Sequence, residues 1–180
     1  MSSELKLIPA SSQTVGPYFR IGLQYMIDRP SATPHASGLI IRGRVLDRDG
    51  APVPDAMLEF WSPDCGETSP SEPCSPGFRR VATDLDGGFS VAVPRPDPLK
   101  TKEGSAQAPH FLVLVFARGL LRHLITRVYL ADEPSNASDP VLLSVPADRR
   151  NTLIARQDER DTFGWDIILQ GTNETIFFAW

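Results

Sequence analysis

The hydrophobic pattern of the chain is dominated by one run of large apolar residues. Residues 111–116 read FLVLVF without a polar interruption, which is too short for a membrane span but typical of a strand buried on both faces. Ala117-Arg118-Gly119 ends the run, and a second strand-forming segment follows at residues 124–130. Two strand segments joined by a glycine-containing turn predict a β-hairpin.

Short strand-like segments recur along the rest of the chain, separated by turn residues. After Gly38, apolar and polar positions alternate up to an Asp49-Gly50 turn, which is a common hairpin signal. No segment sustains the 3.6-residue period of a helix. The other strands that we expect are at residues 39–45, 56–61, 79–83, 89–93, 152–156, 163–170 and 175–180, with a short helical turn at 147–150.

About nine short strands joined by turns indicate an all-β protein with a β-sandwich fold. At 180 residues the chain fits a single domain that can bury its own core. Residues 1–37 show little periodicity, so we expect an extended N-terminal arm followed by the sandwich domain at 38–180. Polar loops are expected at 62–77 and 94–108, and a proline-bounded linker at 132–146.

The charge of the chain narrows its possible functions. The net charge is −4 and the isoelectric point is about 5.3, which argues against nucleic-acid binding, since that depends on basic patches. The N-terminus has no basic head followed by an apolar segment, so we expect neither a signal peptide nor a membrane anchor. A cytoplasmic protein is expected.

Four motifs carry a resemblance to a known family. They are Gln13-Thr14-Val15-Gly16-Pro17-Tyr18, Ala108-Pro109-His110, Phe116-Ala117-Arg118-Gly119 and Thr126-Arg127-Val128-Tyr129. With their surroundings they resemble the intradiol ring-cleavage dioxygenases, and more narrowly the α chains of the members built from α and β chains. The resemblance spans most of the chain apart from its two long loops, and that family's fold is also a β-sandwich.

The resemblance implies non-haem ferric iron, held by two tyrosines and two histidines. Both tyrosines would have to lie between residues 26 and 128, but the only tyrosines of this chain are Tyr18, Tyr25 and Tyr129. The paired-histidine position reads His110-Phe111-Leu112. One surviving imidazole cannot hold iron against water and competing chelators. We therefore expect no metal site in this chain, with His110 as a vestige of one.

By the same resemblance, the Fe(III) belongs to a partner β chain in a hetero-oligomer, and no residue of this chain alone is catalytic. The substrates implied are 3,4-dihydroxybenzoate and O2, and the product is 3-carboxy-cis,cis-muconate. An aromatic carboxylate needs a cation or hydrogen-bond donors, which an arginine and backbone amides can offer. The residues expected to line the substrate pocket of the β chain are Arg118, Tyr18, Thr14, Gly16 and Pro17.

Simpler interpretations remain for each of these residues. A turn arginine such as Arg118 is usually solvated, Tyr18 could serve only to pack the arm, and His110 could be a satisfied histidine of a buried strand. Residues 41–61 also resemble the opening of transthyretin-like and carboxypeptidase-regulatory sandwiches, which would make the chain a noncatalytic binding module. That alternative leaves the arm motif and the Phe-Ala-Arg-Gly turn unexplained, and the missing tyrosines disfavour a self-sufficient dioxygenase.

Overall fold

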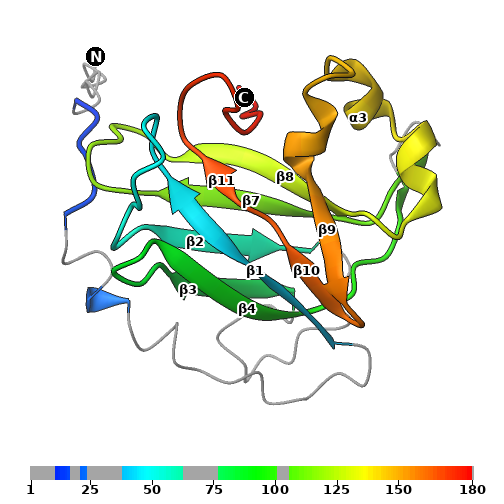
Figure 1. Ribbon diagram of the computed structural model, residues 1–180, viewed down its shortest axis with the longest axis horizontal. Coiled ribbons are helices and arrows are strands. Elements are labelled where there is room, and N and C mark those ends of the chain that lie inside the picture. The colour runs from blue at the N-terminus through cyan, green and yellow to red at the C-terminus, as the bar shows by residue number, and fades with distance from the viewer. Residues whose placement is uncertain (1–10, 17–20, 24–37, 63–76, 101–105, 180) are drawn as a thin grey trace, which may run out of the picture.

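The computed structural model describes residues 11–16, 21–23, 38–62, 77–100 and 106–179 (Figure 1). Strands make up most of the regular structure in these residues. The main strands are β1 (Gly38–Leu46), β2 (Met57–Trp61), β3 (Phe78–Ala82), β4 (Gly88–Pro94), β7 (His110–Phe116), β8 (Leu124–Leu130), β9 (Ile154–Glu159), β10 (Thr162–Gly164) and β11 (Ile167–Ile168). A separate ribbon, β5 (Leu99–Lys100) with β6 (Ala106–Gln107), forms within the expected polar loop.

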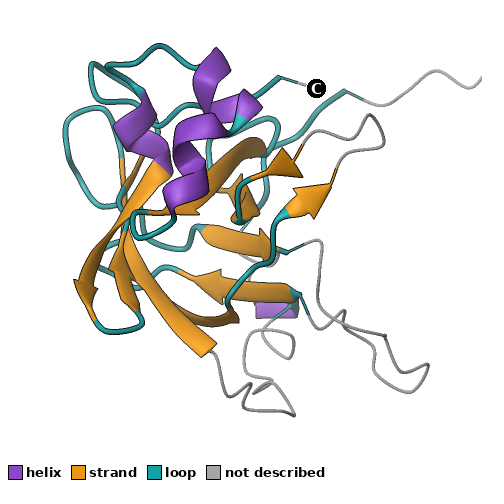
Figure 2. Ribbon diagram, turned by 90° about the vertical axis from the view of Figure 1, so that its right-hand side faces the viewer, coloured by secondary structure: helices purple, strands orange, loops and turns teal. Residues whose placement is uncertain are grey.

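Two groups of strands face each other across one core. In the first group β4 pairs with β1, β1 with β10 and β10 with β9, while in the second β3 pairs with β2, β2 with β7 and β7 with β8. Strand β9 also pairs with β8, so it joins the two groups along one side. The two views show these layers as a sandwich (Figures 1 and 2). The all-β sandwich predicted from the sequence is confirmed.

The predicted hairpin forms the centre of the second group. Strands β7 and β8 pair in antiparallel register from His110 opposite Tyr129 to Val115 opposite Leu124. The expectation that its first strand is buried on both faces is wrong, because burial alternates along β7. Phe111 and Val113 are completely buried in the core between the sheets, whereas Leu112 and Leu114 on the other face are only partly covered. A sandwich strand packs on the core with one face only.

The C-terminal strands differ most from the expectation. The strand expected at 163–170 divides into β10 and β11, which keep one register with β1 but are separated at Trp165 and Asp166, where the N–H of Arg44 donates to Oδ1 of Asp166. No strand is assigned at residues 175–179. This segment lies against β8 through isolated bonds, such as that from Phe178 N–H to the carbonyl of Ile125, which do not make a ladder.

The expected linker at 132–146 contains two short helical segments. They are a 3-10 helix, Pro134–Ser138, and α3, Pro140–Ser144 (Figure 1). A second 3-10 helix, Arg150–Leu153, begins at the last residue of the helical turn expected at 147–150 and extends into the strand expected at 152–156. Asp139 caps α3 by accepting the N–H groups of Val141 and Leu142. An aspartate before a proline is a recognised helix start, so this element was readable from the sequence. Within the described residues, no helix has the length and apolar character needed to cross a membrane.

We predict that Gly43→Ala destabilises the fold severely. A Cβ atom at this position would lie 1.8 Å from the backbone oxygen of Trp165, so the backbone itself would have to move. The free energy of unfolding, measured by urea denaturation, should fall by about 4 kcal/mol or more. Gly22→Ala is the control, since nothing lies within 4 Å of its Cβ position. Equal stability of the two variants would contradict the close approach of β1 to Trp165.

Candidate substrate-contact site

The turn between β7 and β8 presents Arg118 at one end of the sandwich. Ala117 before it is buried at 1% exposure, and its carbonyl accepts the N–H of Leu120, which closes the turn. Gly119 has φ of +91°, a conformation that residues with a side chain rarely adopt. The side chain of Arg118 is 56% exposed. Its guanidinium is therefore carried on an ordered turn with access to solvent.

The N-terminal arm is joined to this turn by a hydrogen bond. The N–H of Gly119 donates to Oγ1 of Thr14 at 2.8 Å, although the two residues are 105 positions apart. Figure 1 shows the arm, in blue, beside the turn that follows β7. Gly16 has open space around it, while Pro17 and Tyr18 lie outside the described residues. The structure thus brings Thr14 together with Arg118, two of the residues that the sequence singled out.

Asp55 is a charged neighbour of this turn that the sequence analysis missed. Its Oδ2 lies 3.5 Å from Nη2 of Arg118. Asp55 is in the turn before β2 and has φ of +59°, in the left-handed region. Antiparallel pairing of β2 with β7 was the signal that could have located it, because the last pair, Met57 with Phe116, brings the adjoining turns to the same end of the sheet.

A hollow of about 600 Å³ lies beside the arm and the turn. Its wall combines Val15 of the arm, Leu120 and His123 of the turn region, and Phe177 near the C-terminus. The imidazole of His123 packs on the ring of Phe116, with 5.3 Å between the ring centres. The arm, the turn and the C-terminal segment therefore meet at one end of the molecule around a largely apolar hollow.

His110 lies at the opposite end of β7 and is 5% exposed. Its Nδ1 is 2.7 Å from the carbonyl oxygen of Ala108, which can only accept a hydrogen bond, so Nδ1 carries the proton. The ring also packs against Tyr129 at 5.3 Å between centres. Burial lowers the pKa of His110 below its usual value, so the imidazole is neutral at physiological pH.

The phenol that packs against His110 is engaged in a buried polar network. The hydroxyl of Tyr129 donates to Oδ1 of Asp139 at 3.1 Å, and Nη1 of Arg127 lies 3.4 Å from the phenol oxygen. Burial raises the pKa of Tyr129 well above its usual value. Because the raised pKa and the bond to Asp139 keep this phenol protonated, it is poorly suited to bind iron as a phenolate.

The residues around His110 do not fit the four-ligand ferric site of the family. Leu112, at the second histidine position, has no coordinating atom. Across the described part of the chain, no group of three or more histidine, cysteine, aspartate or glutamate side chains could hold a metal ion. No step of a reaction is therefore assigned to a metal in this chain, and its expected lack of iron stays a prediction.

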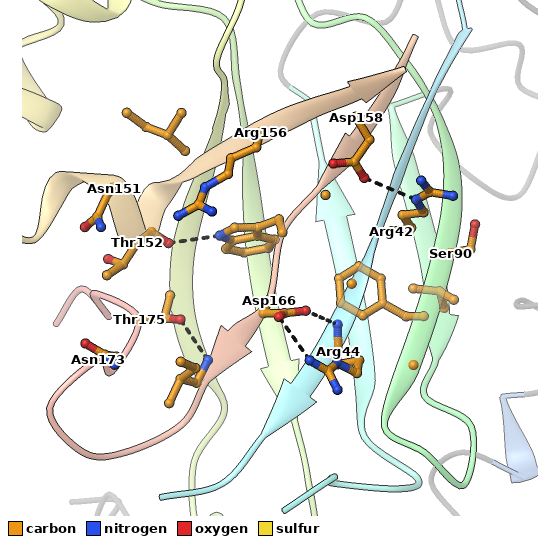
Figure 3. A pocket seen from close by; sticks show the side chains of 18 of the residues that line it. Arg42, Arg44, Ser90, Asn151, Thr152, Arg156, Asp158, Asp166, Asn173 and Thr175 are labelled. Carbon is orange, nitrogen blue, oxygen red and sulfur yellow. Dashed lines mark hydrogen bonds and ion pairs between the residues drawn. The ribbon is translucent and has the colours of Figure 1, made fainter. Parts of the chain in front are cut away.

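A larger and more polar groove, of about 1100 Å³, lies over the outer face of β1 and β10 (Figure 3). Two ion pairs lie along it, since Arg42 is 3.3 Å from Asp158 and Arg44 is 3.6 Å from Asp166, and Asp148 and Arg156 also line it. Neither Thr14, Gly16, Arg118 nor His110 lines it. The groove has the character of a solvated sheet face.

Comparison with known proteins matches most of the chain to one family. The family model described as "Dioxygenase" matches residues 24–171. A protocatechuate 3,4-dioxygenase alpha chain from Burkholderia cepacia is 42% identical over 191 residues, which cover 93% of this chain and 95% of the relative. The beta chain of that enzyme, from the same organism, is 26% identical over 160 residues, which cover 79% of this chain and 68% of the relative.

A solved structure supports the fold. The dioxygenase domain of a dioxygenase and carbohydrate-binding protein fusion from Streptomyces sp. SirexAA-E superposes with a TM-score of 0.58 at 24% identity, covering 80% of this chain and 86% of that one. The sequence matches favour the dioxygenase interpretation over the transthyretin-like alternative. The chain belongs to the intradiol ring-cleavage dioxygenases, in the branch of the protocatechuate 3,4-dioxygenase alpha chains.

Proposed function

We propose that this chain is the noncatalytic subunit of a two-chain dioxygenase that cleaves the ring of 3,4-dihydroxybenzoate. In this proposal a β chain carries the Fe(III), and the present chain completes its substrate pocket. The reaction breaks the bond between the two hydroxyl-bearing carbons and adds both atoms of O2, which gives 3-carboxy-cis,cis-muconate. The α and β chains from Burkholderia cepacia both resemble this chain, as expected of subunits that share one fold.

The observation that carries the proposal is the bond between Thr14 and Gly119. It supports a single contact surface made of the arm and the Arg118 turn, which lies at the end of β7 away from His110. Arg118 would receive the carboxyl group of the substrate, since an arginine can bind a carboxylate through two N–H groups at once. Thr14 would hold the arm in place, while Gly16, Pro17 and Tyr18 would line the pocket.

The proposed roles of the two subunits follow from the side chains that this chain contains. This chain has one histidine and no tyrosine at the expected ligand positions, and that histidine is buried and bonded to Ala108. It can still supply a cation and backbone donors to a neighbouring site. In this proposal, the present chain therefore binds and orients the substrate.

The first test is the iron content and the protocatechuate-dependent O2 uptake of purified protein. Both should be absent from this chain alone, and both should appear after co-expression with the β chain of the same organism. Ferric iron and O2 uptake in the pure chain would contradict the ligand argument. Absence of both from a purified two-chain complex would contradict the proposed function.

The second test replaces Arg118 with alanine in the two-chain complex. Loss of a charge-assisted hydrogen bond should raise the KM for 3,4-dihydroxybenzoate by about 10- to 100-fold, with iron content and assembly unchanged. Catechol, which has no carboxyl group, should be affected much less. Arg160→Ala is the control, because this arginine lies in another turn with its side chain 96% exposed. Equal losses for both substrates would contradict carboxylate recognition.

The third test replaces Thr14 with valine, which keeps the shape of the side chain but removes the acceptor for Gly119 N–H. Since the bond is solvent-exposed, we expect only a several-fold fall in kcat/KM, on the order of one net hydrogen bond. Thr14→Ser retains the hydroxyl and should retain most of the activity. If valine and serine behave alike, the hydroxyl does not hold the arm.

A further inference from the structure

We propose that Asp55 is a positioning residue that holds the Arg118 guanidinium in place to receive the carboxyl group of the substrate. The proposal rests on the function proposed above and adds a residue to it. The evidence is the ion pair between Asp55 Oδ2 and Arg118 Nη2, at 3.5 Å. Asp55 would act through Arg118 and would not touch the substrate itself.

The location of the pair follows from the pairing of β2 with β7. Met57 of β2 lies opposite Phe116 of β7. Asp55 and Arg118 both lie in turns just beyond this last ladder pair. The paired strands therefore bring the two turns to the same end of the sheet, where the ion pair joins them.

The backbone that carries Asp55 is firmly held on both sides. The hydroxyl of Thr83 donates to the carbonyl of Val53 at 2.8 Å and accepts the N–H of Ala56 at 2.9 Å. Thr83 is 1% exposed, so water does not compete for these bonds. Between them Asp55 adopts φ of +59°, which aspartate and asparagine tolerate better than most residues. The carboxylate is thus presented from a fixed point.

Arg118 is held at its backbone in the same way. Ala117 is buried, and Gly119 is bonded to Thr14 of the arm. The long side chain between these points would sample many rotamers in solution. An ion pair from a fixed carboxylate restricts that freedom and directs the guanidinium toward the end of the sandwich where the arm lies.

The geometry leaves Arg118 able to bind a second carboxylate. A separation of 3.5 Å is longer than a charge-assisted hydrogen bond, so the pair does not saturate the five N–H donors of the guanidinium. The charge of Asp55 would also repel an anionic substrate, but exposed charges are screened by water and salt. With the Asp55 side chain 32% exposed and Arg118 56% exposed, screening weakens this repulsion and the net effect of the pair is modest. A rise in KM when the charge of Asp55 is removed is the sign that positioning predicts.

The test is Asp55→Asn in the co-expressed two-chain complex. Asparagine keeps the shape of the side chain and its tolerance of positive φ, but it removes the charge. The KM for 3,4-dihydroxybenzoate should rise by about 2- to 5-fold, while kcat, iron content and the kinetics with catechol stay close to those of the unaltered complex. An unchanged or lowered KM would overturn the proposal.

A matched control is available on the outer face of the other strand group. Asp158 pairs with Arg42 at 3.3 Å, and the two side chains are 38% and 50% exposed, much like Asp55 and Arg118. Asp158→Asn removes an ion pair of the same kind away from the turn, so the KM should not change. A rise equal to that of Asp55→Asn would mean that both substitutions act through general stability, which would overturn the proposal.

The double variant separates positioning from a structural role. When Arg118 is already alanine, adding Asp55→Asn should change the KM no further, whereas an equal further loss would show that Asp55 acts independently of Arg118. If Arg118→Ala weakens recognition of 3,4-dihydroxybenzoate but Asp55→Asn does not, only this inference fails. If Arg118→Ala itself has no selective effect, the proposed function of the turn fails as well.

Discussion

Five residue pairs join β2 to β7, from Met57 with Phe116 to Trp61 with Leu112. This antiparallel register sends Leu58, Phe60, Val113 and Val115 into the core. A slip of one residue would reverse the facing of every side chain on the strand, so burial of these residues specifies the register strongly. The same pairing brings the turns that carry Asp55 and Arg118 to one end of the sheet, where the two side chains form an ion pair. Core packing and the contact at the surface thus depend on one set of backbone hydrogen bonds.

The two ends of β7 have different roles. At its start, His110 packs on Tyr129 and bonds to the carbonyl of Ala108. Nearby, the buried carboxylate of Asp139 accepts the N–H groups of Ala108, Val141 and Leu142 as well as the Tyr129 hydroxyl. A buried charge is tolerable when it is fully bonded. The surroundings of His110 are therefore part of the scaffold in this chain.

At the other end of β7, the groups are polar, accessible and held at their backbones. Arg118, Thr14 and Asp55 converge there from the turn, the arm and the segment before β2. Each contact is weak by itself because water reaches it. Their common support by buried residues such as Thr83 and Ala117 is what gives the group a definite geometry. Such a surface suits recognition of a charged group in a site shared with another chain.

Local pattern was enough to predict the hairpin, most strands and the sandwich class, because alternation and turn residues act over a few neighbours. That residues 26–128 contain no tyrosine and that Leu112 follows His110-Phe111 could also be read directly from the sequence, and the expected lack of iron that follows from the resemblance stays a prediction. Other features were decided only by the tertiary structure. They are the break between β10 and β11 at Trp165, the course of residues 175–179, the bond from Gly119 to Thr14 and the pairing of Asp55 with Arg118. These features join residues far apart in the sequence, and their geometry depends on strand register and on which side chains are buried together.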